Sequence, residues 1–204
     1  LKNEGIVLTD IDLGGGFGVT YDEEPAFDVT AWGRRVKERL SDQGLRLSIE
    51  PGRFLTANAG VLLTRVEYLK IGEENSGSSE ASSVGKHFAV VDAAMNDLLR
   101  PTLYEAHHNI EPISNLGPAI GLADIVGPVC ETGDYLGRER QMPNLQTGDR
   151  LAVMSAGAYG AVMASSYNTR PPAGEVMVLD GKVNVLRQQR SVKSLLDEES
   201  IPNF

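Results

Sequence analysis

Two short motifs near the start of the chain carry residue types suited to binding a phosphorylated ligand. The first is the glycine triplet at residues 14–16, which follows an apolar strand-like run and precedes a stretch with helical periodicity. Glycines let backbone N–H groups turn toward an anion, and a helix N-terminus adds a favourable dipole. Taken alone, this pattern is equally consistent with a phosphate site and with a tight strand-to-helix turn. It is neither the dinucleotide fingerprint nor a P-loop, because the other residues of those motifs are missing.

The second motif is EPGR at residues 50–53, where the next predicted strand ends. One crossover separates it from the glycine triplet, so we expect both motifs at the carboxyl edge of neighbouring parallel strands, where barrel enzymes build their active sites. Glu50 is suited to hold a protonated ring nitrogen there. Arg53 is suited to hold a phosphate or carboxylate through two parallel hydrogen bonds. A salt bridge on a surface turn is the alternative.

The residues around these motifs predict the order strand, loop, helix, strand. We expect strands within residues 5–13 and 45–49 and a helix within residues 28–44, whose apolar residues recur four apart on one stripe. Asp28 or Thr30 can cap the helix start, and Gly44 can close its end. Together they predict a parallel crossover unit. One such unit cannot bury its own sheet, so we expect further units upstream or from another chain.

After about residue 60 the sequence changes to short β-rich runs separated by Gly, Pro or Asn, a pattern typical of a barrel or sandwich. We expect strands within residues 60–71, 86–94, 109–114, 123–129, 149–156, 175–181 and 182–187. One helix is predicted over residues 158–168. The Ser/Gly/Glu-rich residues 73–85 are predicted to form an exposed, mobile hairpin tip.

Composition narrows the function classes. The 204 residues carry a net charge of −9 and no basic cluster, which disfavours a nucleic-acid partner. No apolar run is long enough to cross a membrane, and the first residues do not resemble a signal peptide. The single cysteine, Cys130, excludes an internal disulfide and fits a reducing compartment, so we expect a cytoplasmic protein.

Four further stretches complete a recognisable order of motifs: AAMNDLLRPTLYEAHH (93–108), GPVCETGDYLG (127–137), SAGAYG (155–160) and SSYNTRP (165–171). With the glycine triplet and EPGR, they closely resemble the C-terminal part of the bacterial diaminopimelate decarboxylase family. That family is the lysine-producing branch of the fold-type III, alanine racemase-like, pyridoxal-phosphate decarboxylases. The resemblance covers essentially the whole chain. Ornithine and arginine decarboxylases share the first two motifs, whereas RPTLY, CETGD and YNTRP point to the diaminopimelate branch.

The resemblance implies a fold class of α/β plus all-β. Residues 1–58 would be the last strands and helix of a TIM-type (β/α)8 barrel that binds the cofactor. Residues 59–204 would form a C-terminal β-barrel or sandwich domain, with one helix returning to the active site.

The implied cofactor is pyridoxal 5′-phosphate, with its phosphate on the glycine loop and its pyridine nitrogen on a carboxylate. A protonated nitrogen makes the ring a strong electron sink. The implied cofactor-binding residues are Gly15, Gly16, Glu50, Gly52, Arg53 and Tyr159.

The resemblance also implies a substrate site and a proton donor. The implied substrate-binding residues are Arg53, Arg100, Tyr104, Glu131 and Tyr159, and the implied catalytic residue is Cys130. Arg100 and Glu131 have the charges needed to hold the carboxylate and ammonium at the far end of diaminopimelate. A thiol with a pKa of about 8.5 is mostly protonated at neutral pH and can protonate a carbanion. In the family the CETGD segment reaches the partner subunit's site, which implies a homodimer with composite sites.

Most of these residues also have structural interpretations. A lone cysteine such as Cys130 is more often an inert buried thiol, and Arg100 is also suited to pairing with Asp97. The two tyrosines of the implied site are suited to a core or an interface. Arg170 is expected to close a turn after the last long helix. The adjacent histidines at 107 and 108 share no face and have no third ligand at a helical interval, so no metal site is assigned. Asp10 and Asp12 are interpreted as solvated or structural.

One feature of the family is missing from the sequence. The family carries its cofactor as a Schiff base on a lysine in a Tyr-Ala-x-Lys-Ala-like motif early in the barrel. No lysine here lies in such a motif; the lysines are Lys2, Lys37, Lys70, Lys86, Lys182 and Lys193. We therefore expect the chain to be the C-terminal part of a longer protein, lacking the N-terminal barrel segment and inactive alone.

The predicted function of the parent protein is decarboxylation of meso-2,6-diaminopimelate to L-lysine. A decarboxylase of another basic amino acid, of ornithine or arginine type, is less favoured, because ornithine-type enzymes carry Asp near the cysteine where this chain has Glu131. A non-catalytic regulatory homologue is the third hypothesis. It has no need to keep Glu50, Arg53, Cys130 and Tyr159 together.

Overall fold

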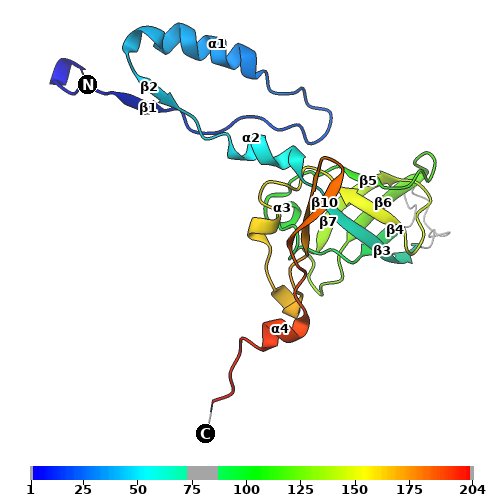
Figure 1. The fold of residues 1–204 in the computed structure, drawn as a ribbon. Coiled ribbons are helices and arrows are strands. Elements are labelled where there is room, and N and C mark those ends of the chain that lie inside the picture. Colours follow the sequence, from blue (N-terminus) through cyan, green and yellow to red (C-terminus); the bar gives the residue numbers. More distant parts are fainter. Residues whose placement is uncertain (1, 73–86, 203–204) are drawn as a thin grey trace.

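The N-terminal segment is a parallel crossover, as the sequence predicts. In the computed structural model, which describes residues 2–72 and 87–202, a turn at Lys2–Glu4 leads to β1 (Asp10–Asp12). Strand β1 pairs in parallel with β2 (Arg46–Ser48), and α1 (Val29–Leu40) connects them (Figure 1). Strand β1 is shorter than predicted because only one strand flanks it.

Local signals set the ends of α1 as expected. The carboxylate of Asp28 accepts a hydrogen bond from the Ala31 N–H at 2.8 Å, which satisfies one free donor of the first turn. A short 3-10 turn, Ser41–Gln43, follows the helix and ends at Gly44 in the left-handed conformation.

The helix does not begin directly after the glycine loop, which corrects the expectation that its dipole faces the loop. Residues 17–28 run without regular structure before α1 begins at Val29. Phe17 is buried in this stretch, with its ring edge-on to Phe27 at 5.4 Å and to Trp32 at 4.8 Å between centroids. Packing of these aromatic rings takes the chain away from the loop before it turns into the helix.

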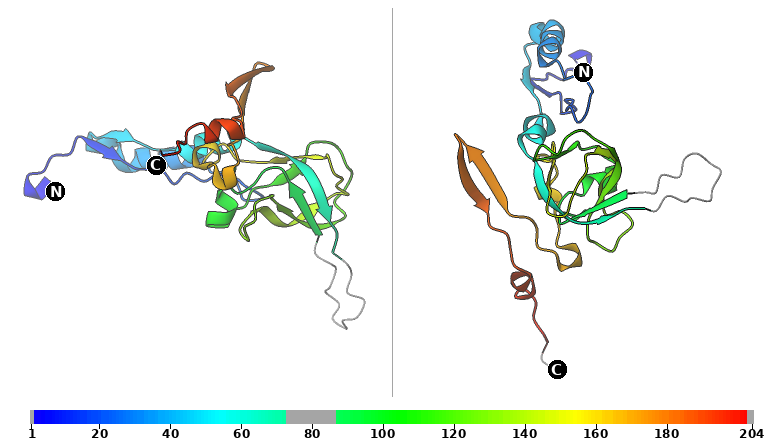
Figure 2. Two further views of the ribbon diagram at one scale, coloured as in Figure 1. Left: turned by 90° about the horizontal axis from the view of Figure 1, so that it is seen from below. Right: turned by 90° about the vertical axis from the view of Figure 1, so that its right-hand side faces the viewer.

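The centre of the molecule is a nearly closed mixed sheet of six strands among the described residues, in the order β5-β8-β3-β4-β6-β7 (Figure 2). The strands are β3 (Leu62–Lys70), β4 (His87–Val91), β5 (Ile110–Pro112), β6 (Gly121–Val126), β7 (Tyr135–Met142) and β8 (Arg150–Val153). Only the β4–β6 pairing is parallel. Strand β3 bends at an irregularity between Val66 and Tyr68, so it pairs with β8 along its first half and with β4 along its second.

Apolar side chains fill the interior of this sheet. The fully buried ones include Val66, Val91, Leu98, Ile125, Leu136, Leu151 and Val153. They come from five of the strands and from the turn that precedes α3 (Arg100–Tyr104). This core confirms the predicted β domain.

Two predictions for this domain need correction. Strand β7 was not expected, because its exposed positions are charged or polar and Leu136 and Met142 are its buried apolar side chains. The helix predicted over residues 158–168 is wrong: the chain forms two short 3-10 turns, Ala161–Met163 and Tyr167–Thr169. Between them the Ser165 N–H donates to the carbonyl of Asn96, which holds the chain away from a helical path.

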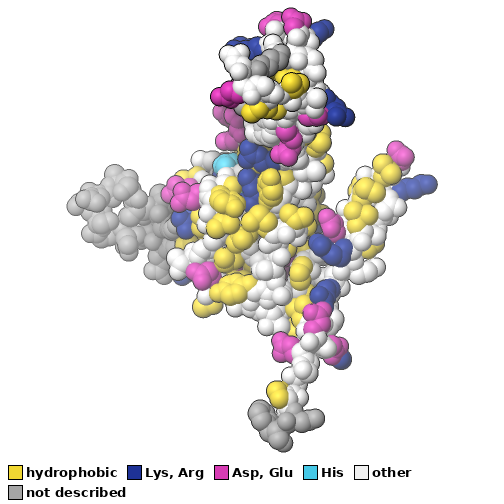
Figure 3. All heavy atoms as spheres, turned by 90° about the vertical axis from the view of Figure 1, so that its left-hand side faces the viewer, with side chains coloured by type: hydrophobic (Ala, Val, Ile, Leu, Met, Phe, Trp, Pro, Cys, Tyr) yellow, Lys and Arg dark blue, Asp and Glu magenta, His cyan; other side chains and the backbone are white. Residues whose placement is uncertain are grey.

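The C-terminal strands form a separate hairpin. Strands β9 (Glu175–Leu179) and β10 (Lys182–Arg187) pair in antiparallel fashion across Asp180 and Gly181, both with positive φ. The hairpin projects from the central sheet and is followed by α4 (Val192–Leu196) (Figures 2 and 3). Apolar side chains remain exposed along it, so the described chain covers neither of its faces.

Two further predictions from the sequence concern a hairpin tip and membrane-spanning segments. The predicted hairpin tip at residues 73–85 lies outside the described residues. Within the described ranges, no helix is long and apolar enough to cross a bilayer.

Candidate active site

The glycine loop and Glu50 lie side by side where β1 and β2 end. The Leu13 N–H donates to the Ser48 carbonyl at 3.0 Å, and the Glu50 N–H donates to the Gly14 carbonyl at 2.9 Å. These bonds continue the parallel ladder beyond both strands. The geometry confirms that the two motifs share one edge, the carboxyl edge of the pair.

Each residue of the triplet has a backbone reason to be glycine. Gly14 and Gly16 have φ values of 69° and 83°, a conformation that L side chains rarely adopt. A Cβ atom on Gly15 would lie 2.8 Å from the carbonyl oxygen of Glu50. The sharp turn and the close approach of the two strand ends therefore depend on all three.

The loop leaves backbone donors free for an anion. The carboxylate of Asp12 accepts the Gly14 N–H at 2.7 Å and fixes the start of the turn. In the part of the chain that the structure describes, the N–H groups of Gly15 and Gly16 have no acceptor, and both residues are exposed. Such a set of free amides suits a phosphate group. Asp12 and Asp10, which pairs with Arg46, serve structural contacts as expected.

Arg53 lies on α2 (Gly52–Thr56), one residue into the helix that follows Glu50. Its side chain is half-buried, while Glu50 and Gly52 are exposed. Helix α2 runs into a 3-10 turn, Ala57–Ala59, whose first residue is fully buried. The predicted cofactor residues Glu50, Gly52 and Arg53 thus lie within one continuous segment that leads from β2 into α2.

The SAGAYG loop is bound to that same segment. The Ala156 N–H donates to the Gly60 carbonyl at 2.8 Å, and the Gly157 N–H donates to the Ala57 carbonyl at 3.0 Å. A Cβ atom on Gly157 would collide with the carbonyl oxygen of Thr56. This contact fixes the loop that carries Tyr159 to the helix that carries Arg53.

Tyr159 is held in a strained conformation at the surface. It has a φ of 59°, which is uncommon for a residue with a bulky side chain, and its side chain is partly exposed. The docked loop holds this conformation, which presents the ring beside Arg100: the Arg100 Cζ atom lies 5.9 Å from the ring centroid.

Arg100 is the buried charge of the site. The residue is 7% exposed. Its Nη1 donates to the Tyr21 hydroxyl at 3.0 Å and lies 3.2 Å from His108 Nε2. Its Cζ atom also lies 5.1 Å from the centroid of the Tyr21 ring. The alternative pairing of Arg100 with Asp97 is wrong, because Asp97 faces the Arg170 guanidinium at 3.9 Å instead.

The CETGD loop is anchored onto α3 but keeps its reactive side chains outside. The Thr102 hydroxyl donates to the Gly133 carbonyl at 2.5 Å, and the Asp134 carboxylate accepts the N–H groups of Met95 at 2.7 Å and Val129 at 2.6 Å. Burial raises the pKa of Asp134.

Cys130 and Glu131 are both exposed, so the interpretation of Cys130 as a buried thiol is wrong. Among the described residues, no hydrogen bond or ion pair joins either side chain to the glycine loop, Glu50 or Arg53. Tyr104, at the end of α3, is 63% exposed. The structure therefore brings together part of the predicted site and leaves these three side chains facing solvent.

Arg170 has a structural position. Its Nε donates to Asn96 at 3.1 Å and its Nη2 to the Asp92 carbonyl at 2.5 Å, so it ties the YNTRP segment to the sheet. The long helix expected before it is replaced by short turns. Across the described ranges, no group of three His, Cys, Asp or Glu side chains is arranged to hold a metal ion.

Sequence reasoning missed Tyr21 and His108 as members of the site. Tyr21 is distant from Arg100 in sequence, and His108 follows α3 as the second of two adjacent histidines. The only signals were their nearness in sequence to the glycine loop and to RPTLY.

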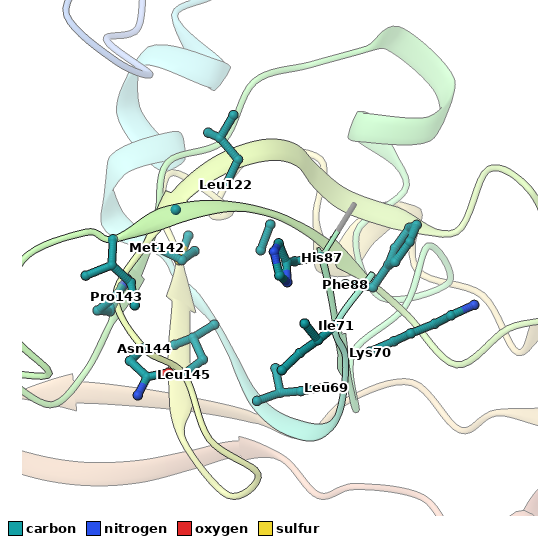
Figure 4. A pocket seen from close by; sticks show the side chains of 13 residues that line it. Leu69, Lys70, Ile71, His87, Phe88, Leu122, Met142, Pro143, Asn144 and Leu145 are labelled. Carbon is teal, nitrogen blue, oxygen red and sulfur yellow. The ribbon is translucent and has the colours of Figure 1, made fainter. Parts of the chain in front are cut away.

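An apolar pocket of about 200 Å³ opens elsewhere, between β4, β6 and the end of β7 (Figure 4). Leu69, Phe88, Leu122, Met142 and Leu145 are among its lining residues. None of the predicted site residues lines it. This pocket is therefore separate from the predicted site.

Comparison with known proteins identifies the class. A family model described as the C-terminal sheet domain of pyridoxal-dependent decarboxylases matches residues 11–157. The chain therefore belongs to the pyridoxal-dependent decarboxylase family. The matched residues include the glycine loop, EPGR, RPTLY and CETGD.

The individual relatives carry a more specific name than the family model does. A diaminopimelate decarboxylase of Neisseria meningitidis serogroup A is 46% identical over 199 residues, covering 98% of this chain and 46% of the relative. One of Pseudomonas fluorescens is 49% identical over 198 residues, covering 97% of this chain and 44% of the relative. The crystal structure of diaminopimelate decarboxylase from Helicobacter pylori complexed with L-lysine superposes with a TM-score of 0.83 at 37% identity. It covers 96% of this chain and 46% of that one, so the chain spans about half the length of these relatives.

Proposed function

We propose that this chain is the C-terminal part of a pyridoxal-phosphate decarboxylase that converts meso-2,6-diaminopimelate to L-lysine and CO2. The observation that carries the proposal is the pairing of the glycine loop with Glu50 at one strand edge. The likeness to diaminopimelate decarboxylases over nearly the whole chain supports the substrate. In this proposal residues 1–58 complete a TIM-type barrel, residues 59–204 form the β domain, and the lysine that carries the cofactor lies outside the chain.

The residues at the strand edge fit this cofactor. Free amides at Gly15 and Gly16 suit its phosphate, and the exposed Glu50 carboxylate suits the protonated pyridine nitrogen. Gly52, Arg53 and Tyr159 complete the set. When bound, the cofactor supplies a cationic ring that stabilises the negative charge left on the α-carbon after loss of CO2. Glu50 maintains that charge by keeping the ring nitrogen protonated.

Arg100 is proposed to bind the far carboxylate of the substrate, because it is a buried cation oriented by protein contacts. Tyr104, Tyr159 and Arg53 line the path beside it in this proposal. The H. pylori relative holds L-lysine, whose ammonium and carboxylate groups require the same kinds of partner. In this proposal Glu131 of a second subunit supplies the carboxylate for the far ammonium group.

Cys130 and Glu131 are proposed to act in the site of a second subunit. Both are exposed on a loop that Thr102 fixes to α3 and that Asp134 fixes to the backbone of Met95. A homodimer with composite sites places the Cys130 thiol where it donates its proton to the α-carbon of the partner's substrate. This role requires a reduced thiol, so we propose a cytoplasmic location.

The test is a substrate panel on the full-length protein that contains this chain, supplied with pyridoxal phosphate. We expect CO2 release from meso-diaminopimelate, with L-lysine as the product, at a kcat/KM at least tenfold above that for ornithine or arginine. Preference for ornithine or arginine would favour the second decarboxylase class. Cofactor binding without turnover of any of the three would contradict the proposal.

A further inference from the structure

We propose that His108 is a positioning residue that, together with Tyr21, turns Arg100 so that its Nε and Nη2 groups face a carboxylate ligand. This inference rests on the proposed function, in which Arg100 binds the far carboxylate of the substrate. It assigns the orientation of that arginine to two side chains outside the predicted site.

The hydrogen bonds of Arg100 divide its guanidinium into two edges. Nη1 carries two hydrogens, and two acceptors lie within reach of it: the Tyr21 oxygen at 3.0 Å and His108 Nε2 at 3.2 Å. Within the described ranges, no protein group accepts from Nε or Nη2. These two groups point the same way and match both oxygens of a carboxylate.

The tautomer of His108 makes this arrangement possible. Its Nδ1 lies 2.8 Å from the Met154 carbonyl oxygen, which can only accept, so Nδ1 carries the hydrogen. In the neutral ring Nε2 is then an acceptor and pairs with the Arg100 N–H. A protonated ring would instead place an N–H against a cation.

Burial keeps the ring neutral. His108 is fully buried, with its ring edge-on to Tyr21 at 5.5 Å between centroids. Burial lowers its pKa, the hydrogen bond to the Met154 carbonyl partly opposes this, and the Arg100 charge lowers the pKa again. A neutral, immobile acceptor orients a cation without cancelling its charge, so Arg100 keeps its full attraction for an anion.

Two substitutions of His108 in the full-length protein distinguish a role in orienting Arg100 from a role in filling space. In His108→Asn the shorter amide can still donate to Met154 but offers nothing at Nε2. In His108→Gln the longer amide places an oxygen near the Nε2 position. We expect H108N to raise KM for meso-diaminopimelate about tenfold with a smaller change in kcat, and H108Q to restore most of the loss.

His107→Asn is the matched control. His107 is adjacent in sequence, but its ring contacts Arg140 and Asp22 and not Arg100. We expect its KM to stay within about twofold of the parent value, as for a substitution outside the site. Equal KM increases in H108N and H108Q would show that His108 only fills space, and would overturn the proposal.

NMR of the imidazole nitrogens in the full-length protein gives a readout independent of turnover. We expect His108 to carry its hydrogen on Nδ1. A hydrogen on Nε2 would overturn the inference even if the protein decarboxylates diaminopimelate. An Nδ1–H ring in a protein that does not turn over this substrate would support the orientation of Arg100 and contradict the proposed function alone.

Discussion

Gly15 shows how a single residue fixes the distance between two functional groups. Its backbone passes so close to Glu50 that a methyl group in its place would lie 2.8 Å from the carbonyl oxygen. The amides proposed for the phosphate and the carboxylate proposed for the ring nitrogen are therefore held at a set spacing. Neither group is positioned by its own side-chain contacts.

Gly15→Ala in the full-length protein should push the two strand ends apart. We expect a loss of about 1–3 kcal/mol in the free energy of unfolding, measured with urea, and weaker binding of pyridoxal phosphate. Gly33→Ala is the control, because it lies within α1 with nothing near its Cβ position. It should raise stability by up to about 1 kcal/mol. Cofactor affinity unchanged in G15A would contradict this role of Gly15.

His108 also predicts a pH dependence of stability. Burial lowers its pKa below the ordinary value of 6.5, so the unfolded chain takes up a proton before the folded one does. The stabilising contribution is present above pH 6.5 and is lost as the pH falls through the folded pKa. The charged or titratable groups that influence the ring are Arg100, His107 and Arg140, and Tyr21 packs against it.

We therefore expect the free energy of unfolding to fall more steeply between about pH 7 and 5 in the parent than in His108→Gln, which has no ring to protonate. Denaturant titrations at several pH values measure the difference. Parallel curves for the two proteins would show that the ring is not held neutral by the fold.

At the scale of elements, the junction between the SAGAYG loop and α2 aligns residues from two parts of the sequence. Gly157 packs directly against the backbone of Thr56, and two backbone hydrogen bonds close the contact. Tyr159 and Arg53 are placed relative to each other by this junction. A substitution at this junction is therefore expected to alter the site without replacing a residue proposed to bind the cofactor or the substrate.

Gly157→Ala should separate the loop from α2. We expect kcat/KM to fall by about a hundredfold, as for a small misplacement of positioning groups. The conformation of the glycine loop at residues 14–16 should not change, because Gly157 does not contact it. Gly121→Ala, at the start of β6 with nothing near its Cβ position, is the control and should retain activity. Equal activity in the two variants would show that the junction does not position the site.

The sequence predicted those elements whose signals are local. Alternation, capping by Asp28 and the glycine turns indicated the crossover and most strands of the sheet. Strand β7 was missed because its outward residues are charged, and the helix at residues 158–168 was predicted wrongly because a contact with Asn96 decides that path. Tyr21 and His108 joined the site only through folding, since no local pattern marks a partner so distant in sequence.

At the scale of the whole molecule, the described residues leave two sheet-forming elements without a covering layer. A two-stranded parallel pair carries the glycine loop, and an apolar hairpin projects uncovered from the central sheet (Figure 3). The chain spans about half the length of its relatives. A two-stranded sheet cannot bury both of its faces, so under the proposed function we expect the site to need further sheet-forming residues.

The isolated chain, mixed with pyridoxal phosphate and meso-diaminopimelate, should therefore release no CO2 above background. The full-length protein under the same conditions should release it steadily. Turnover by the isolated chain would show that its own residues suffice and that the proposed division of the site is wrong.

The most direct test of the central claim is a crystal structure of the full-length protein with pyridoxal phosphate bound. We predict that the phosphate accepts hydrogen bonds from the amides of Gly15 and Gly16, and that the Glu50 carboxylate pairs with the pyridine nitrogen. A cofactor bound elsewhere, with Glu50 facing solvent and the glycine-loop amides hydrated, would contradict the account.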